Sequence, residues 1–548
     1  MSMMADFNFD SDDDSDFSGF GPSDIDLSSS DSSSDDVDNV ADAGVSTLTN
    51  RLLPPRVEDF VGEPGPNLPD GFDVSTATPL DFFKFVFPVS LITYLADMTN
   101  LYANWRQAQP GVDLDDRWEE TTEAEMRAFL AINILMDINI LPTLEMYWST
   151  KMLIGNVGAQ QIMTCNRFQK LSKYFHASDR TGDRPRGHID YDRLYKVRHV
   201  MTTLSTTFRE MWTLSREATV DKAMIAFTGR LSYMPAKPIK RRIKLWMLCD
   251  ARTAYVHRFE VYLGRQENRP EHGLGFNGVT THTDHLQHTH RWIFFDNFFT
   301  SIELMKRLLE DGLYACGTVR VNKKGFPSEL KKPRDMRDRG AYKSLQCQGL
   351  TATVWKDKRL VHHLSTVGDP TTVLMATRHA GPRAEQYMQQ EPTSLYNQFM
   401  GGVDRHDARR AKFGVGRPGK KALRYWFLLN SAIVNAYIIY KKASTRSHSK
   451  KRFEHMDFRI ELIEELIAGF AKRKRGPGDR AALVALVDQE NQHLHRNERM
   501  PGDKGARCRY HRAYLNKRKE TVYGCRICNV HLCKVGCHAR YHELSQDQ

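Results

Sequence analysis

The sequence predicts an α/β protein in which helical segments precede and follow the strands of the sheet. A small metal-binding module is predicted near its C-terminal end. Three observations lead to this fold class. Short β-type segments gather between about residues 217 and 320, where strand, aspartate, helix and strand follow in that order. Apolar residues at helical spacing dominate before and after this region. Five of the nine cysteines fall between Cys508 and Cys537, interleaved with histidines, which suits metal better than disulfides in a chain of this size.

The first 70 residues are predicted to form a disordered acidic arm. Residues 1–50 carry 13 Asp and no Glu, Lys or Arg, and a proline-rich stretch follows, so this segment cannot bury a core. Residues 51–548 hold 78 basic and 54 acidic groups, a net charge of +24 against +11 for the whole chain. A basic body with an acidic tail favours a polyanionic ligand, although proteins of ribosomes or membrane surfaces share such a balance.

Neither a membrane span nor an export signal is expected. The longest apolar candidate covers residues 425–440 and contains Asn430 and Asn435, so it predicts a buried helix too short to cross a bilayer. The N-terminal segment lacks the basic start and apolar run of a secretory signal. The run AKRKRGPG (471–478) predicts a nuclear import signal, and a basic DNA-contacting linker explains it equally well.

The segment before residue 216 is predicted to be helical. Leu80, Phe83 and Phe87 share one face of a helix that should end near Pro88, because proline cannot continue a helix. Residues 123–140 repeat apolar side chains at the same spacing. Both aromatic and aliphatic stripes favour a buried core.

The pattern changes near Glu217. EATVDKAMIAF (217–227), IKLWMLCD (243–250) and YVHRFEVYLG (255–264) predict short strands, and the last two form a hairpin that turns at Asp250–Thr253.

A crossover unit comes next. RWIFFD (291–296) predicts a strand, which leads into a helix with Thr300 or Ser301 as its N-cap and Gly312 at its C-terminal end. LYACGTVR (313–320) then returns as a strand, as an α/β sheet requires.

These elements define the predicted domain boundaries. The segment after residue 325 is polar at first, then contains a hairpin, and helical patterning resumes at Tyr396. The predicted parts are a disordered arm at 1–70, a helical segment at 71–215, a strand-rich segment at 216–325, a polar segment with a hairpin at 326–394, a short segment at 395–407, a second helical segment at 408–490, a linker at 491–505 and the Cys/His module at 506–545.

Aspartates stand where predicted strands or loops end. They are Asp221, Asp296 and Asp404, with Asp407 one helical turn beyond the last. Carboxylates are ligands that Mg²⁺ prefers, and two such ions serve phosphodiester chemistry. A strand-end aspartate is also a common turn former, so spacing alone does not decide between the two roles.

Basic residues follow these aspartates in three clusters. They suit contacts with a phosphate backbone, although each cluster alone also fits a solvated surface. The residues are Lys237, Lys240, Arg241, Arg242 and Lys244; Arg320, Lys323 and Lys324; and Arg409, Arg410, Lys412, Arg417, Lys420, Lys421 and Arg424.

The C-terminal module carries eight candidate zinc ligands in close pairs. Thiolate and imidazole pairs suit tetrahedral zinc, and eight of them predict two ions, in a cross-brace arrangement. The ligands are Cys508, His511, Cys525, Cys528, Cys533, Cys537, His538 and His542, with His531 as a rival for the place of His538.

Several sequence motifs resemble the piggyBac transposase family. They are VDKAMIAFTGR, MPAKPIKRRIKLWMLCD, YVHRFEVYLG, FFDNFFTS, CGTVRVNKKGFP, the LST of the predicted hairpin and YNQFMGGVDRHD, in this order. The resemblance extends from about residue 80 to His542 and includes the Cys/His module.

The resemblance implies an RNase H-like catalytic core of the DDE/D class in two parts, 216–325 and 395–407. An insertion at 326–394 interrupts the core, and helical DNA-binding and dimerisation segments flank it. The family motifs map the catalytic, Mg²⁺-binding aspartates onto Asp221, Asp296 and Asp404, with Asp407 assisting. A homodimer would excise an element from double-stranded DNA through hairpin ends and join it at TTAA sites in the nucleus. The zinc module would recognise the terminal repeats of the element.

The chain departs from the family pattern at three positions. Lys222 replaces the usual Glu after the first aspartate, Thr228 replaces a commonly basic residue, and Ala408 replaces a common Gln. None removes a proposed metal ligand, but Lys222 places a cation beside Asp221. Two alternatives to an active transposase follow: a retained DNA- or chromatin-binding descendant, and, from the zinc module alone, a ubiquitin ligase.

Overall fold

The computed structural model describes residues 49–112, 114–151, 154–226, 242–263, 273–378, 385–413, 426–443, 453–468, 470, 497–500, 505–515, 517–525, 530–534, 536–538 and 541. The chain divides into two compact units, Met1–Phe470 and Ala471–Gln548, and each is described by itself.

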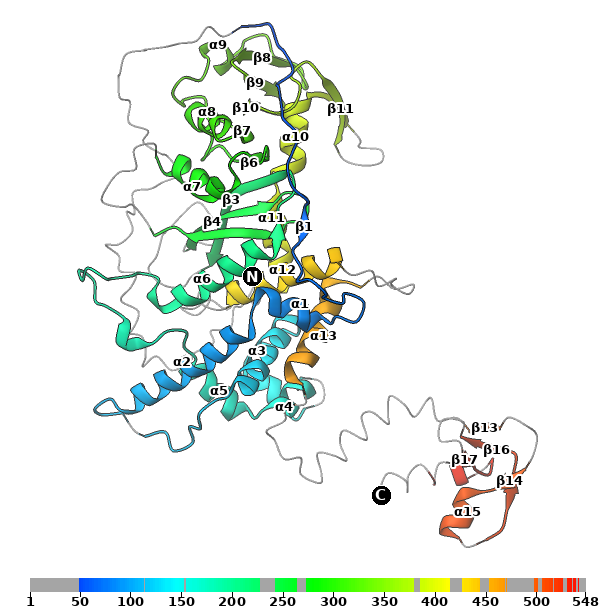
Figure 1. Ribbon diagram of the computed structural model, residues 1–548. Helices are drawn as coiled ribbons and strands as arrows, with labels where there is room; N and C mark the ends of the chain where they lie inside the picture. The colour runs from blue at the N-terminus through cyan, green and yellow to red at the C-terminus, as the bar shows by residue number, and fades with distance from the viewer. Residues whose placement is uncertain are drawn as a thin grey trace. The chain divides into compact units, whose positions relative to one another are not determined.

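An eight-stranded mixed sheet forms the centre of the first unit (Figure 1). Its spatial order is β5-β4-β3-β6-β7-β10-β9-β8; β3 pairs with β6 and β6 with β7 in parallel, and all other neighbours are antiparallel. The strands are β3 (Glu217–Ala226), β4 (Arg242–Asp250), β5 (Val256–Val261), β6 (Trp292–Phe295), β7 (Tyr314–Thr318), β8 (Tyr342–Cys347), β9 (Leu350–Lys356) and β10 (Leu360–Ser365).

Helices cover both faces of this sheet. Figure 1 shows α7 (Leu274–Thr283) and α8 (Ile302–Glu310) to the left of the sheet, and α10 (Glu391–Phe399) and α11 (Gly402–Ala411) to its right. Helix α8 begins at Ser301, whose side chain accepts a hydrogen bond from the Leu304 amide, so Ser301 is the N-cap of the two that the sequence offered.

The hairpin predicted at Asp250 is confirmed, and its turn is held by that side chain. The Asp250 carboxylate is fully buried and accepts hydrogen bonds from the backbone amides of Ser215, Arg252 and Thr253 and from the Trp212 indole. A buried carboxylate is tolerated where several donors satisfy it, so Asp250 stabilises the turn between β4 and β5.

A helical layer packs beneath the sheet. It consists of α1 (Pro79–Val86), α2 (Val89–Gln107), α3 (Glu123–Ile138), α4 (Val157–Ile162), α5 (Cys165–Tyr174), α6 (Tyr195–Glu210), α12 (Leu428–Ala443) and α13 (His455–Ile467). Both helices predicted here are confirmed, and α3 begins at Thr122, whose side chain accepts from the Glu125 amide. No single described helix is long and apolar enough to cross a membrane, and α1 and α2 reach that composition only as a pair bent by 69°.

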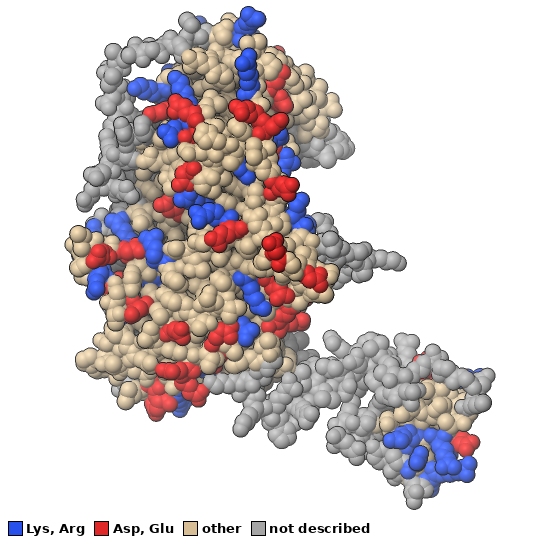
Figure 2. Space-filling view, viewed as in Figure 1, with Lys and Arg blue, Asp and Glu red and all other residues tan. Residues whose placement is uncertain are grey.

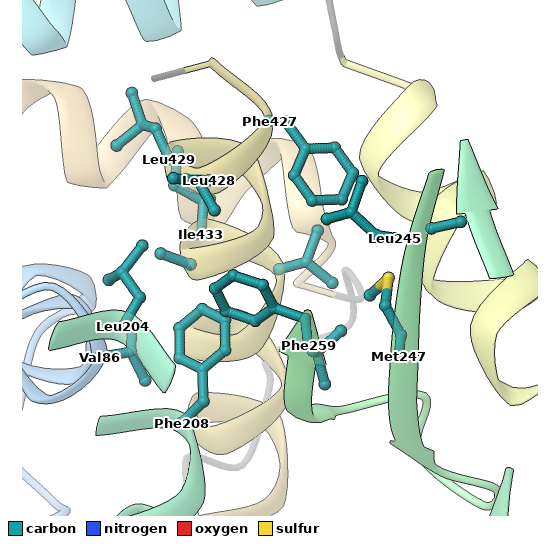
Figure 3. Packing of buried hydrophobic residues seen from close by; sticks show 14 of the residues in the cluster. Val86, Leu204, Phe208, Leu245, Met247, Phe259, Phe427, Leu428, Leu429 and Ile433 are labelled. Carbon is teal, nitrogen blue, oxygen red and sulfur yellow. The ribbon is translucent and has the colours of Figure 1, made fainter. Parts of the chain in front are cut away.

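A continuous apolar core joins this layer to the sheet (Figure 3). Phe208 of α6 is fully buried, and its ring centroid lies 5.9 Å from that of Phe259 on β5. Val86 of α1 and Ile433 of α12 belong to the same cluster. Helices from both ends of the unit, far apart in sequence, therefore hold the edge of the sheet that carries β4 and β5.

The disordered arm was predicted to extend over residues 1–70, and this boundary is wrong because the chain is ordered from Thr49. From Thr49 the chain is packed along the sheet: Thr49 exchanges both backbone hydrogen bonds with Gln346 of β8, and the Glu58 amide donates to the Tyr314 hydroxyl at 2.8 Å. Farther on, β1 (Gly65–Pro66) pairs with β2 (Trp212–Thr213). The segment has little apolar surface of its own, but it satisfies its backbone groups against strands that the local sequence does not reveal.

The predicted insertion, residues 326–394, is partly built into the sheet. Its strands β8 to β10 continue the sheet because β10 pairs with β7, while β11 (Val373–Arg378) and β12 (Glu385–Gln390) form a separate hairpin. A short helix, α9 (Ser328–Lys331), precedes them. Helix α10 begins at Glu391, four residues before the predicted return to the core at 395.

The described residues of the second unit form a small β-rich module with one short helix. Its elements are β13 (Asn497–Arg499), β14 (Ala506–Arg507), α15 (Arg509–Tyr514), β15 (Glu520–Thr521), β16 (Tyr523–Cys525) and β17 (Val530–His531). Strand β13 pairs with β16, so part of the predicted linker, residues 491–505, belongs to the module.

Candidate active site and metal-binding module

Asp221 and Asp296 lie side by side on two parallel strands. Val220 of β3 lies opposite Phe295, the last residue of β6, so each aspartate is the next residue along its own chain. Asp221 was predicted to stand at a strand end, but β3 continues for five residues beyond it, and only Asp296 directly follows the end of its strand. The parallel register brings together two aspartates that lie 75 positions apart in the sequence. The amide of Phe298 donates to the Asp296 carboxylate at 2.9 Å and fixes its orientation.

Helix α11 brings Asp404 and Asp407 to the face of the sheet on which Asp221 lies. Side chains alternate along a strand, so Asp221 shares a face with Thr219, and Thr219 lies directly against Gly402 of α11. A Cβ at Gly402 would come within 2.8 Å of the Thr219 hydroxyl oxygen, so only glycine permits this approach.

Three α11 side chains hold the helix to the turn between β4 and β5. Arg405 donates to the Ala251 carbonyl, Arg409 donates to the Thr253 carbonyl at 2.5 Å, and a His406 ring nitrogen lies 3.1 Å from the Ala254 carbonyl oxygen. No role for Arg405 or His406 was predicted from the sequence. The glycine pair at residues 401–402 was the one local signal for the close helix–strand contact.

The carboxylates influence one another strongly. Burial, followed by the neighbouring Asp296 carboxylate, raises the pKa of Asp221 to about 7, and Asp404 acts in the same direction. Burial also raises the pKa of Asp407, although the Arg410 guanidinium, 3.2 Å away, counteracts this effect. Concentrated negative charge of this kind is relieved by a cation.

Lys222 supplies one positive charge at this site. Its ammonium nitrogen lies 3.7 Å from the Asp296 carboxylate and 4.7 Å from the centre of the Phe298 ring. Its backbone amide donates to the Asp221 carboxylate at 2.7 Å.

The residues present fit a hard divalent cation. Asp221, Asp296 and Asp404 offer carboxylate oxygens from three separate segments, as Mg²⁺ sites in phosphoryl-transfer enzymes do. Among the described residues, however, only the cysteine–histidine group of the second unit has all its ligand atoms within 4.8 Å of one another. The three carboxylates must therefore draw closer, or share their ion with substrate and water, to coordinate it.

The predicted DNA-contacting residues divide into three groups. Arg320 lies at the rim of the aspartate site, where its guanidinium donates to the Asn297 side chain at 3.3 Å, and Lys323 and Lys324 follow it in a turn. Arg409 and Arg410 are engaged within the protein, by the Thr253 carbonyl and by Asp407. Lys244 lies on β4.

Other members of the basic clusters cannot be placed in the same way. For Arg242 the structure describes the backbone. Seven residues lie outside the described part of the chain: Lys237, Lys240, Arg241, Arg417, Lys420, Lys421 and Arg424.

Four of the eight predicted zinc ligands gather in the second unit. Cys508, His511, Cys533 and Cys537 have all their ligand atoms within 4.8 Å of one another. The His511 Nδ1 atom lies 3.3 Å from the sulfurs of Cys508 and Cys537 and 3.6 Å from that of Cys533. Tetrahedral zinc, with bonds of ~2.0 Å to nitrogen and ~2.3 Å to sulfur, places such atoms roughly 3.5 Å apart, so this group fits zinc.

The group joins the first and third ligand pairs and passes over the second, as a cross-brace requires. Cys525 is buried on β16 and His538 is half-buried beside Cys537. Cys528 and His542 lie outside the described residues, so the second group of ligands stays a prediction. His531, the rival ligand, lies on β17.

Exposed basic side chains gather on one face of this module (Figure 2). They come from β14, α15 and the segment that leads to β15, and they are Arg507, Arg509, Arg512, Lys517, Arg518 and Lys519.

Comparison with known proteins identifies the family. A family model described as Transposase IS4 matches residues 78–437. The human PiggyBac transposable element-derived protein 3 is 24% identical over 493 residues, covering 86% of this chain and 78% of that protein. The chain belongs to the piggyBac transposase family.

Further piggyBac relatives agree in sequence and in structure. The human PiggyBac transposable element-derived protein 5 is 25% identical over 449 residues, covering 78% of this chain and 81% of that protein. A cryo-electron microscopy structure of a piggyBac transposase synaptic complex with hairpin DNA superposes with a TM-score of 0.64 at 25% identity. The match covers 87% of this chain and all of that one.

Proposed function

We propose that this chain is a DNA transposase that cleaves and rejoins phosphodiester bonds at Asp221, Asp296 and Asp404, with Asp407 assisting. The observation that carries the proposal is the meeting of acidic side chains from β3, the end of β6 and the first turn of α11 at one edge of the sheet. A mixed sheet with carboxylates on adjacent parallel strands, one within β3 and one just past the end of β6, supports an RNase H-like core of the DDE/D class. The family match supports the same reaction.

The three aspartates would hold Mg²⁺. When bound, Mg²⁺ supplies activation of the attacking oxygen and stabilisation of the leaving oxygen in phosphodiester chemistry. The protein contributes the fixed orientation of the carboxylates: the Phe298 amide holds Asp296, and the packing of Gly402 on Thr219 sets the distance of Asp404 from β3. Arg410 keeps Asp407 paired, which makes Asp407 a supporting rather than a principal ligand.

Double-stranded DNA is the proposed partner. The net charge of the body, the exposed basic face of the zinc module and Arg320 at the rim of the acidic site support phosphate contacts. The similarity to a piggyBac transposase synaptic complex with hairpin DNA supports excision through hairpin ends. TTAA-targeted integration and action as a homodimer enter the proposal through the resemblance of the sequence motifs to the family. Two structural Zn²⁺ ions in the module and a nuclear location complete the proposal.

An excision assay in cells tests the proposed reaction. The donor carries the terminal repeats of the cognate element, and the readout is seamless repair of the donor to TTAA. The wild type should excise, Asp296→Asn should lose excision while retaining DNA binding, and Asp284→Asn, which removes an exposed partner of Arg258 away from the site, should excise normally. Excision by Asp296→Asn at the wild-type rate would show that the acidic site is assigned wrongly.

A second candidate is a DNA- or chromatin-binding protein that descends from a transposase and has lost catalysis. The 3.7 Å contact between Lys222 and Asp296 favours it, because a lysine ammonium competes electrostatically with metal for that carboxylate. The same assay separates the two: binding of the wild type to the terminal repeats without excision would favour this candidate.

A further inference from the structure

Lys222 is held firmly at the acidic site. Its side chain is 23% exposed and that of Asp296 is 27% exposed, so neither partner belongs to the freely solvated surface. The ammonium lies between the Asp296 carboxylate on one side and the Phe298 ring on the other. A lysine over an aromatic ring gains cation–π attraction in addition to its ion pair.

The strand register explains why Lys222 reaches this place. Lys222 lies opposite Trp246 of β4, and Trp246 packs against Gly278 of α7, so the lysine stem leaves the face of the sheet opposite to Asp221. Asp296 follows the last residue of β6, so the alternation of side chains along a strand does not restrict it to one face of the sheet. Asp221 therefore approaches Asp296 from the α11 side, and Lys222 approaches it from the α7 side.

The charges at the site then favour one divalent ion over two. Asp221, Asp296 and Asp404 together carry three negative charges when ionised, while Asp407 is paired with Arg410. Lys222 places one positive charge within ion-pair distance of Asp296, and its charge together with those of the three carboxylates amounts to two negative units. One Mg²⁺ neutralises that charge, whereas a second would add repulsion with the ammonium.

We propose that the Lys222 ammonium takes the place of the second metal ion, so that this chain binds a single Mg²⁺ between Asp221, Asp296 and Asp404. The inference rests on the proposed function, since it concerns the metal content of the same site. It assigns Lys222 the role of a tethered cation that shares Asp296 with the bound ion.

The number of ions bound per chain tests this proposal. Mn²⁺ replaces Mg²⁺ as the probe, because electron paramagnetic resonance detects free Mn²⁺ directly, and the full zinc-loaded chain is titrated without chelator. The double variant Asp221→Asn, Asp296→Asn defines the background binding. Lys222→Met removes the charge but keeps an apolar stem against Phe298, and Lys222→Arg keeps the charge. Lys84→Met is the matched control, because it removes a lysine from a 3.5 Å ion pair with Asp81 on α1, away from the site.

Above background, one ion is expected for the wild type, Lys222→Arg and Lys84→Met, and two for Lys222→Met. Two ions in the wild type would overturn the proposal, and this result does not depend on whether Lys222→Met folds. One ion in a folded Lys222→Met variant would overturn it as well. In both cases the proposed metal site would stand. No ion above background in any variant would instead contradict the acidic metal site itself, and the inference would fail with it.

Discussion

Replacing Asp221 with asparagine is expected to stabilise the metal-free protein, and to do so more at alkaline than at acidic pH. The reason is that Asp221 is a partly buried ionisable side chain close to the Asp296 carboxylate, so the folded chain disfavours its charged form. Asparagine has nearly the same shape, and its amide oxygen can accept the hydrogen bond from the Lys222 amide. It carries no charge at any pH.

The magnitude follows from the pKa of Asp221, which burial and then Asp296 raise from 3.8 to about 7. Below about pH 4 the carboxyl is protonated in both the folded and the unfolded chain, and its charge does not oppose folding. Between pH 4 and 7 the unfolded chain loses the proton while the folded chain retains it, so the free energy of unfolding falls as pH rises. With ~1.4 kcal/mol for each pH unit, the cost is about 2 kcal/mol at pH 5 and about 4 kcal/mol at pH 8.

Urea unfolding at pH 5 and pH 8, followed by circular dichroism in buffer that retains zinc but contains no Mg²⁺, measures this cost. The difference in unfolding free energy between Asp221→Asn and the wild type should grow by ~2 to 3 kcal/mol between the two pH values. Subtraction of the wild type removes the titration of all groups that do not interact with Asp221. Asp97→Asn, on the exposed side of α2, is the matched control and should show the same difference at both pH values.

A difference that stays the same at pH 5 and pH 8 would refute the reasoning, because Asp221 would then ionise alike in the folded and unfolded chain. Added Mg²⁺ provides an internal check on the proposed site. At pH 8, Mg²⁺ should reduce the difference in unfolding free energy between Asp221→Asn and the wild type, because only the wild type can use the ion to neutralise Asp221.

Three further predictions concern the core and the zinc module. Phe208→Ala should lower the free energy of unfolding by ~3–5 kcal/mol in the same assay, because the ring is fully buried, while Leu101→Ala, 49% exposed, should change it by less than ~0.5 kcal/mol. Asn435→Ala should cost ~2–4 kcal/mol and speed amide exchange at Val256, since the buried Asn435 amide pairs with both the amide and the carbonyl of that strand residue. His511→Ala should reduce the zinc content measured by elemental analysis and leave unfolding of the first unit unchanged, and a wild-type zinc content in this variant would contradict the ligand assignment.

The acidic site illustrates how a family pattern and an individual chain can differ. Asp221, Asp296 and Asp404 are the candidate metal ligands, yet Lys222 brings a positive charge to the carboxylate of Asp296. A Lys–Asp contact of this kind changes the affinity for cations without changing the fold, because the strand register and the packing of α11 do not depend on it. Metal content and excision therefore have to be measured separately.

Elements with local signals could be predicted from the sequence alone. The apolar spacing of α1 and α3, the turn at Asp250, an N-cap of α8 at Thr300 or Ser301 and the close cysteine–histidine pairs each depend on residues within a few positions of one another. The candidate aspartates were visible in the same way, although Asp221 lies within β3 and not at its end. Their role became a specific hypothesis only through the resemblance of the surrounding motifs.

The contacts between segments that are distant in the sequence are visible in the tertiary structure and could not be predicted from the sequence. The packing of the segment from Thr49 along the sheet, the continuation of the sheet by β8 to β10 and the pairing of β13 with β16 all rest on backbone hydrogen bonds, which nearly any sequence can make. The contact of Lys222 with Asp296 likewise depends on the register of β3 against β6. Local composition does not predict which segments pair, because the pairing depends on the shape and the unsatisfied hydrogen-bonding groups of a segment that lies far away in the sequence.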